Sequence, residues 1–431
     1  MNSVAPHAVI VADDAAAGVR LCGISMIERL LRDLQRAGMR KATIIGARTE
    51  AAVSALKHDS WARCDVCLTD LEPTKSNCLV EDVIHCVGPA AGDILLVRAG
   101  AYYDPRLLRA AAGSRSPTIT IDSDPPSKLR DLLAGTPRVD NGIMVDLALI
   151  DRSWLTTLSS TTPIFSALQT RTGDVTVARL DVAKQPAYRS DMRRSIRPLW
   201  FPVPTQENIR LATDSILDAA QNSTLDLPAI VHAPIESAIV ARLCWSSVTP
   251  NQVTAATALA GVCVTALFAT GRLWAGAALA LIVGLLDGID GKLARVKVET
   301  TTLGAWEHQL DFVIEMSWWA ALAFAAQTLA PRDNSCAYWW LLLLVSSDLA
   351  DRLAKSSVKN RIGRNLDDAS PFDRTVRLIG GRRNIYIWMF AIALLMHAPI
   401  AGFRAICGWA AITAAVHALR ALQFRRGSAA A

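Results

Sequence analysis

Two aspartates three residues apart, Asp287 and Asp290, follow a long apolar run. At this spacing both carboxylates share one face of a helix. Acids at a membrane boundary are costly unless something neutralises them, and paired acids with open coordination positions suit Mg²⁺ or Mn²⁺ carrying phosphate oxygens. Gly288 and Gly291 leave room for a ligand near the backbone, and Arg295 can bind phosphate through its planar guanidinium. The segment therefore predicts a metal-dependent phosphate site.

A second group of acids follows at Glu307, Asp311 and Glu315, spaced so that they form one stripe on a helix. Two acidic helix ends joined by a short inner loop can converge on a two-metal centre that clamps a transferring phosphoryl group and its nucleophile. Either Asp311 or Glu315 could take the proton from an attacking hydroxyl. His308 could be a metal ligand in its own right.

A plainer interpretation is a helix end whose aspartates are solvated or paired with Lys292 and Arg295. The acidic stripe favours the functional interpretation, because Glu315 lies within an apolar stretch, where an ionisable side chain is a candidate functional residue.

Composition excludes several classes of protein. The chain has 431 residues, of which 52% are hydrophobic and 19% charged, and its mean hydropathy is +0.27. These values exclude a wholly soluble protein, a disordered chain and a disulfide-rich secreted module. The net charge of +6 is modest for this length, so no nucleic-acid partner is expected.

Six apolar runs in the second half predict six membrane crossings, with neighbouring polar residues extending the shorter ones. They span residues 253–269, 273–286, 312–330, 337–349, 385–400 and 403–419. Before them, residues 228–245 predict an amphipathic helix on the membrane surface.

Basic residues orient these crossings. They concentrate between Arg352 and Arg383 and in the tail after residue 419, which predicts a multi-pass protein of the cytoplasmic membrane with both termini in the cytoplasm. The basic loop from Lys355 to Arg383 could hold an acceptor phosphate or anionic lipid head groups, or could reflect topology alone.

The first half alternates strands with helices. Strands are expected at 8–12, 41–47, 92–99 and 118–122, with a helix at 26–37, which predicts an α/β doubly wound parallel sheet with a ligand crevice at the strand ends. We expect this domain at 1–200, a linker with the amphipathic helix at 201–250, and an all-α membrane domain at 251–431.

The acidic segment resembles the signature of the CDP-alcohol phosphotransferase family, DxxDGxxAR(x)8GxxxDxxxD. The first half matches at Asp287, Asp290, Gly291, Ala294, Arg295 and Gly304. The second half departs, because the pattern expects acids where His308 and Phe312 stand. Asp311 fits an early register with Glu307 and a late one with Glu315, so its partner stays open.

This resemblance implies six membrane helices around a cytosol-facing cavity. It implies transfer of a phosphate-bearing group from a CDP-linked donor to an alcohol or polyol-phosphate acceptor, with release of CMP. On this basis Asp287, Asp290, Asp311, Glu307 and His308 are the candidate ligands for Mg²⁺ or Mn²⁺. Gly288, Gly291, Ala294 and Arg295 would contact the donor, membrane lipids would be partners, and a homodimer is a further possibility.

The N-terminal region is similar to sugar-phosphate nucleotidyltransferases in AVIVADDAAAGVRL, MIERLLRDLQRAGMRKATIIGA and VDNGIMV. Fusion of such a domain to a CDP-alcohol phosphotransferase is the plan of bifunctional enzymes that make and use a CDP-polyol. No Lys follows Arg20, and Gly100 and Ala101 stand near the place of a metal-binding Asp, with Asp104 the nearest acid. A nucleotide could still be held by backbone amides near Gly18. We expect a degenerate domain that binds a regulator or only supports the membrane part.

Two other classes of function compete with the transferase. One is a catalytically decayed, membrane-anchored nucleotide-binding or regulatory protein. The other is a transporter, but the chain lacks the internal repeat typical of that class.

Overall fold

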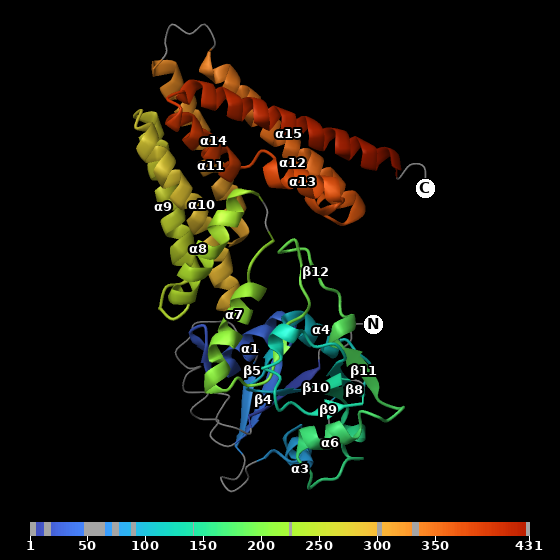
Figure 1. Cartoon of the computed structure of the whole chain (residues 1–431). Coiled ribbons are helices and arrows are strands. Elements are labelled where there is room, and N and C mark those ends of the chain that lie inside the picture. The colour runs from blue at the N-terminus through green and yellow to red at the C-terminus, as the bar shows by residue number, and fades with distance from the viewer. Residues whose placement is uncertain are drawn as a thin grey trace. The chain divides into compact units, whose positions relative to one another are not determined.

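The computed structural model describes residues 6–12, 19–46, 65–70, 77–87, 92–140, 142–223, 226–299, 304–329 and 336–427 (Figure 1). The chain divides into two compact units. The first comprises Met1–Tyr188 and Ser195–Ala219, and the second comprises Arg189–Arg194 and Ala220–Ala431.

The first unit is built on a sheet with strand order β11-β8-β10-β6-β1-β4-β5, and β9 pairs with β10. The strands are β1 (His7–Val11), β4 (Lys41–Gly46), β5 (Asp65–Asp70), β6 (Ile94–Arg98), β8 (Thr118–Asp122), β9 (Arg138–Val139), β10 (Gly142–Ile150) and β11 (Ala178–Asp181). The expected strands at 8–12, 41–47, 92–99 and 118–122 are therefore confirmed. Runs of buried apolar residues form β1 and β6, as is typical of strands covered on both faces.

The expected all-parallel sheet is wrong in one respect, because β10 is antiparallel to both β6 and β8. A parallel return needs a long crossover, usually a helix, whereas an antiparallel one does not. Between β8 and β10 the described residues hold only a short 3₁₀ turn (Ser127–Leu129) and β9, so the chain returns in the opposite direction.

Helices of the first unit flank this sheet and include the expected helix at 26–37, observed as α1 (Met26–Arg36). Ser25 caps it, accepting a hydrogen bond from the Glu28 backbone N–H at 3.2 Å. The others are α3 (Val80–Val87), α4 (Pro105–Ala112), α5 (Arg152–Leu155), α6 (Ile164–Thr170) and α7 (Ile209–Ala219). Six further strands have two residues each and form three separate pairs: β2 (Arg20–Leu21) with β3 (Ile24–Ser25), β7 (Tyr102–Tyr103) with β14 (Trp200–Phe201), and β12 (Tyr188–Arg189) with β13 (Arg194–Ser195).

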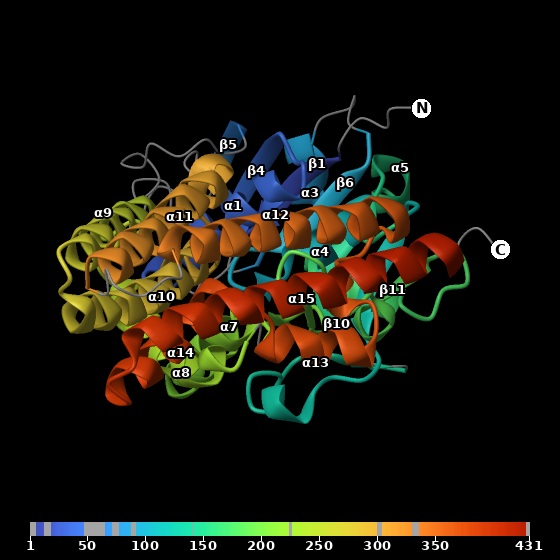
Figure 2. The same cartoon turned by 90° about the horizontal axis from the view of Figure 1, so that it is seen from above.

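The second unit is helical throughout its described part. Its elements are α8 (Pro228–Leu243), α9 (Pro250–Ala269), α10 (Leu273–Val296), α11 (Gly304–Leu329), α12 (Ala337–Ile362), the 3₁₀ turn η5 (Leu366–Asp368), α13 (Pro371–Ile379), α14 (Arg383–Leu395) and α15 (Pro399–Gly427). Helices α12 and α15 pack side by side (Figure 2). A capping box of Thr249 and Gln252, with Pro250 in the first turn, fixes the start of α9.

Aromatic side chains hold the long helices together. Trp318 and Trp319 of α11 are fully buried, and the Trp318 indole N–H donates to the Gly261 carbonyl of α9 at 2.8 Å. Phe268 meets Phe390 edge to face with ring centroids 5.6 Å apart. These contacts join α9, α11 and α14 into one core.

Three of the described helices are long and apolar enough to cross a membrane: α9, α10 and residues 399–425 of α15. A fourth is added if α13 and α14, which meet at a 45° bend, form one span. Helices α11 and α12 each have 26 residues. The middle of α12 carries four charged side chains, those of Asp348, Asp351, Arg352 and Lys355, which lower its hydropathy. The count of six crossings stays a prediction.

We expect Gly261→Ala to destabilise the second unit. An alanine in a helix normally gains up to about 1 kcal/mol over glycine. At Gly261, however, the added Cβ would lie 2.6 Å from Ile314 Cγ2, and overpacking costs about 1–3 kcal/mol.

The measurement is thermal unfolding of the purified chain in detergent, with Gly408→Ala as the matched control. A Cβ at Gly408 meets nothing within 4 Å, so that variant should unfold at or above the wild-type temperature. Equal midpoints for the two variants would contradict the packing of α9 on α11.

Candidate active site

Asp287 and Asp290 lie on the last turns of α10, which continues unbroken to Val296. Asp290 is buried, and the Thr254 hydroxyl of α9 donates to its Oδ2 at 2.7 Å. Asp287 Oδ2 accepts a hydrogen bond from Arg383 Nη2 at 2.6 Å. The helical geometry expected from their spacing is therefore present, and each carboxylate has a partner on another helix.

Arg383, the first residue of α14, connects the two acidic groups. Its guanidinium interacts electrostatically with Asp287 of α10 and with Asp311 and Glu315 of α11. It also lies over the Trp318 ring, 5.9 Å from the centroid. The structure thus brings Asp287, Asp311 and Glu315 around one cation.

Glu315 has further polar neighbours within the helical unit. The Trp319 indole N–H approaches its Oε1 at 3.4 Å, and Asp348 and Arg352 of α12 interact with it electrostatically. Glu307 and His308 lie in the first turns of α11, and their side chains are outside the described residues. The choice between Glu307 and Glu315 as partner of Asp311 therefore stays a prediction.

The two motif glycines have different surroundings. A Cβ at Gly288 would lie 2.2 Å from Glu236 Oε1, so the buried Glu236 carboxyl of α8 occupies the space beside that glycine. A Cβ at Gly291 would lie 3.4 Å from Arg295 Nη1. Burial raises the pKa of the Glu236 carboxyl. Asp287 acts in the same direction, whereas Gln221, Lys292 and Arg295 oppose it.

Residues 220 and 221 orient the basic side chains of the motif. Arg295 Nε donates to the Ala220 carbonyl at 2.8 Å, and Lys292 Nζ donates to Gln221 Oε1 at 2.6 Å and to Ser237 Oγ at 2.5 Å. Ala294, one turn from Gly291, is partly buried on the same helix.

Sequence reasoning did not identify Arg383 as the partner of Asp287, nor the roles of Glu236 and Gln221. Arg383 is 96 residues from Asp287 in the chain, and no local pattern indicates such a pair. An available signal was Glu236 itself, an acid on the apolar helix at 228–245.

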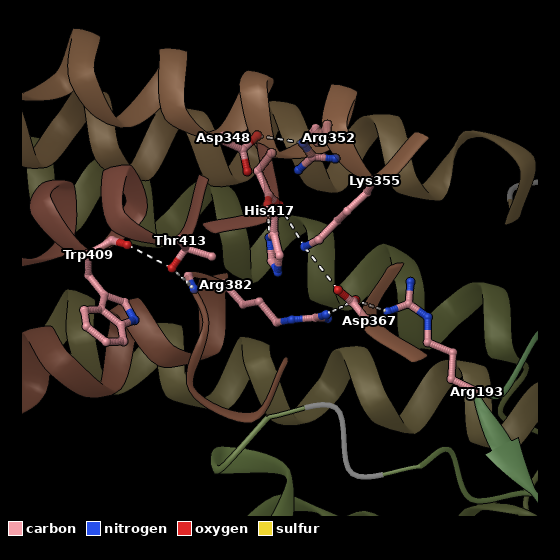
Figure 3. A network of polar contacts seen from close by, with 11 residues as sticks. Arg193, Asp348, Arg352, Lys355, Asp367, Arg382, Trp409, Thr413 and His417 are labelled. Atoms are coloured by element: carbon pink, nitrogen blue, oxygen red, sulfur yellow. Dashed lines mark hydrogen bonds and ion pairs between the residues drawn. The ribbon is translucent and has the colours of Figure 1, made fainter. Parts of the chain in front are cut away.

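A second polar cluster surrounds Asp367 in η5 (Figure 3). The Asp367 side chain is 2% exposed and is contacted by Arg382 Nη2, while Lys355 Nζ lies 3.8 Å away. Lys355 also pairs with Asp351 at 2.8 Å, and His417 binds the other oxygen of Asp351. The basic loop noted in the sequence is therefore ordered around buried acids.

The side chains at this site include the oxygen donors that a divalent ion prefers. Carboxylate oxygens suit Mg²⁺ and Mn²⁺, so the chemistry of Asp287, Asp290 and Asp311 fits such an ion. No three His, Cys, Asp or Glu side chains gather closely enough to hold one within the part of the chain that the structure describes. In the structure, Arg383 interacts electrostatically with Asp287 and Asp311, and Arg295 interacts electrostatically with Asp290.

No acidic residue stands at positions 99–103, directly after β6, where the resemblance predicted that a metal-binding Asp would be missing. Arg98 ends β6 and pairs with Asp146 of β10 at 2.6 Å, and residues 99–101 follow. Asp104 caps α4 and pairs with Arg106 at 2.8 Å, so its carboxylate serves a structural contact. The residues near Gly18 expected to hold a nucleotide lie outside the described residues.

Comparison with known proteins finds a resemblance in the helical unit. The model of the CDP-alcohol phosphatidyltransferase family matches residues 247–417, so this segment is similar to that family. Two curated relatives are each described as a bifunctional IPC transferase and DIPP synthase. The one from Thermococcus kodakarensis is 29% identical over 198 residues, and the one from Aquifex aeolicus is 28% identical over 201.

Each of these two matches covers 46% of this chain and 44% of the relative. The chain therefore matches less than half the length of these relatives.

Among solved structures, the chain is similar to a putative glucose-1-phosphate thymidylyltransferase from Bacillus anthracis, with 9% identity and a TM-score of 0.36 over 49% of this chain and 95% of that one. The inositol-1-phosphate CTP transferase from T. maritima gives 12% identity and a TM-score of 0.34 over 49% and 97%.

Replacing Arg383 by Met should destabilise the second unit by about 1–3 kcal/mol, because it leaves the Asp287 carboxylate without its hydrogen-bond donor. Arg352→Met is the control. The Arg352 side chain is 48% exposed and pairs one turn away with Asp348, and an exposed pair of this kind contributes about 0.5 kcal/mol.

Thermal unfolding in detergent measures both variants. An Arg383→Met midpoint no lower than that of Arg352→Met would show that Arg383 does not compensate the acidic group.

Proposed function

We propose that this protein is an integral-membrane transferase that moves a phosphate-bearing group from a CDP-alcohol donor to an alcohol acceptor, releasing CMP. The observation that carries the proposal is the convergence of acids from α10 and α11 on Arg383 in a segment that matches the family. Such an assembly of ionisable groups among apolar helices is costly, which favours a catalytic site over a decayed one.

Residues of α10 and α14 would bind the donor and balance the charge of the acids. Arg295, whose Nε is held by the Ala220 carbonyl, would direct its remaining N–H groups to the donor diphosphate. Gly291 and Ala294 are small enough to let the donor approach α10 closely, whereas the Glu236 carboxyl fills the space beside Gly288, where the sequence had predicted room for a ligand. Arg383 would balance the acids while the site is empty.

Asp287, Asp290 and Asp311 would hold Mg²⁺ or Mn²⁺, with Glu307 or His308 as further ligands. When bound, the ion would neutralise diphosphate charge and polarise the phosphorus. A carboxylate of α11, Asp311 or Glu315, would accept the proton of the acceptor hydroxyl as it attacks, because an unassisted hydroxyl is a poor nucleophile at neutral pH.

The acceptor is proposed to carry a phosphate, as a polyol phosphate does. The partly exposed cations Lys355 and Arg382 support a polar, phosphate-bearing substrate. We place the chain in the cytoplasmic membrane with both termini on the inner side, in phospholipid or polyol-phosphate synthesis. The first unit is proposed to bind a nucleotide or support the membrane part, without cytidylyl transfer.

Asp287→Asn and Asp290→Asn should each reduce CMP release from a CDP-alcohol by at least about 100-fold, because each removes a carboxylate that would hold the divalent cation needed to neutralise the donor diphosphate. CMP would be quantified with membranes incubated with a panel of CDP-alcohols, with and without Mg²⁺ or Mn²⁺. Asp131→Asn, an exposed acid of the first unit, is the control and should keep full activity. Wild-type rates in either well-inserted α10 variant would refute the proposed function.

Asp311→Asn should lose more activity than Glu307→Gln or Glu315→Gln, since Asp311 is the acid that fits both registers of the motif. Removal of a ligand leaves uncompensated positive charge, whereas water can partly replace a flanking carboxylate. CMP release and divalent-ion titrations would be compared across the three variants. Retained activity in Asp311→Asn together with loss of activity and metal affinity in Glu315→Gln would show that the proposed register of α11 is wrong, and His308 would be the first candidate for the base.

A further inference from the structure

Residues 189–194, here called the strap, group with the second unit although the residues on both sides of them group with the first. Met192 of the strap is 1% exposed, and its carbonyl accepts a hydrogen bond from the Ser223 backbone N–H at 3.1 Å. Arg194 Nη1 donates to the Gln221 carbonyl at 3.1 Å. The strap is thus fixed to Ser223 and to Gln221, whose side chain also accepts a hydrogen bond from Lys292.

Arg193 extends from the strap to the second polar cluster. Its Nη1 donates to Asp367 Oδ2 at 2.7 Å, and its side chain is 30% exposed (Figure 3). The backbone of Arg193 has a φ of +49°, a left-handed conformation that is uncommon for residues other than glycine. The surrounding contacts therefore hold this residue in a conformation that it would seldom adopt alone.

Asp367 is shared by three cations. Burial alone would raise its pKa, but the positive charges of Lys355, Arg382 and Arg193 lower it to about 2. The carboxylate is thus ionised at neutral pH, and as a buried charge it needs these partners.

Lys355 and Arg382 have more N–H donors than their contacts with Asp367 use. Their side chains are 25% and 23% exposed, and an ammonium has three donors and a guanidinium five. Such partly exposed cations at fixed positions are suited to hold a phosphate oxygen.

We propose that Arg193 is a positioning residue for phosphate binding by Lys355 and Arg382. It satisfies Asp367, so that the carboxylate does not draw the other two cations entirely to itself. Without Arg193, Asp367 competes more strongly for Lys355 and Arg382, and this competition weakens phosphate binding. The inference deepens the proposed function, because it names a determinant for a phosphate-bearing acceptor outside the matched segment.

The test is calorimetric titration of the full chain in detergent with inorganic phosphate. Arg193→Ala should weaken binding by about 10-fold, and Arg193→Lys should restore part of the loss, as expected for charge-assisted contacts. Lys184→Ala is the matched control, because Lys184 lies outside the strap with an 82% exposed side chain. Wild-type affinity in Arg193→Ala, or an equal loss in Lys184→Ala, would overturn the proposal.

A positioning role requires that Arg193 act through Asp367. In an Asp367→Asn background, Arg193→Ala should therefore change phosphate affinity by less than about 2-fold, since coupled residues are not additive. An unchanged 10-fold loss in that background would mean direct contact with phosphate and would reject positioning. If Arg193→Ala does not fold, the same comparison with Arg193→Lys decides the point.

Two sources of the phosphate group are separated by two further titrations. One uses soluble sn-glycerol 3-phosphate in detergent. The other repeats the inorganic phosphate titration in nanodiscs with and without phosphatidylglycerol, whose head group would compete if it is the natural ligand. Absence of phosphate binding in the wild type under all conditions would overturn the proposal.

Binding needs no turnover, so its failure is distinguishable from failure of the proposed function. A chain that binds phosphate through Arg193 but releases no CMP would retain this inference and refute the transferase. A chain that releases CMP with a phosphate affinity independent of Arg193 would support the transferase and refute this inference.

Discussion

A charge placed among apolar helices has to be compensated, and the polar architecture of the second unit depends on this requirement. Desolvation of an isolated carboxylate costs far more than one surface contact returns, so each buried acid needs a cation or a donor on a neighbouring element. Asp287 has Arg383, Asp290 has Thr254, and Asp367 has Arg382 and Arg193. Because these partners come from different helices, satisfying the charges also fixes how the helices meet.

The break between α13 and α14 shows how the backbone meets this requirement. The two helices bend by 45°, and Gly381 lies at the bend, where a Cβ would lie 2.2 Å from the Tyr386 hydroxyl oxygen. The Gly381 N–H donates to Thr413 Oγ1 of α15 at 2.9 Å. The bend therefore starts α14 at Arg382 and Arg383, which point to Asp367 and Asp287 respectively, so one turn of chain serves both polar clusters.

Much of this arrangement could be predicted from local sequence, and the rest depends on contacts that sequence spacing does not encode. Buried apolar runs located β1, β4, β6 and β8, and the spacing of Asp287 and Asp290 placed both on one helix, because periodicity records which face is buried. The direction of β10 depends on how the chain returns from β8. The pairing of Asp287 with Arg383 bridges 96 residues. Helix α12 has 26 residues but carries several charged side chains, so it is not among the helices that are apolar enough to cross a membrane, and its predicted crossing rests on the apolar run at 337–349.

The residues that orient the motif lie outside the segment that matches the family. That segment covers residues 247–417, whereas Ala220, Gln221 and Glu236 precede it and contact Arg295, Lys292 and the space beside Gly288. A motif supplies groups with the right chemistry, but their orientation depends on hydrogen-bond partners one layer further out. Chains that share the acidic motif can therefore differ in how they hold Lys292 and Arg295 equivalents, and differences in substrate would follow from the linker as much as from the motif.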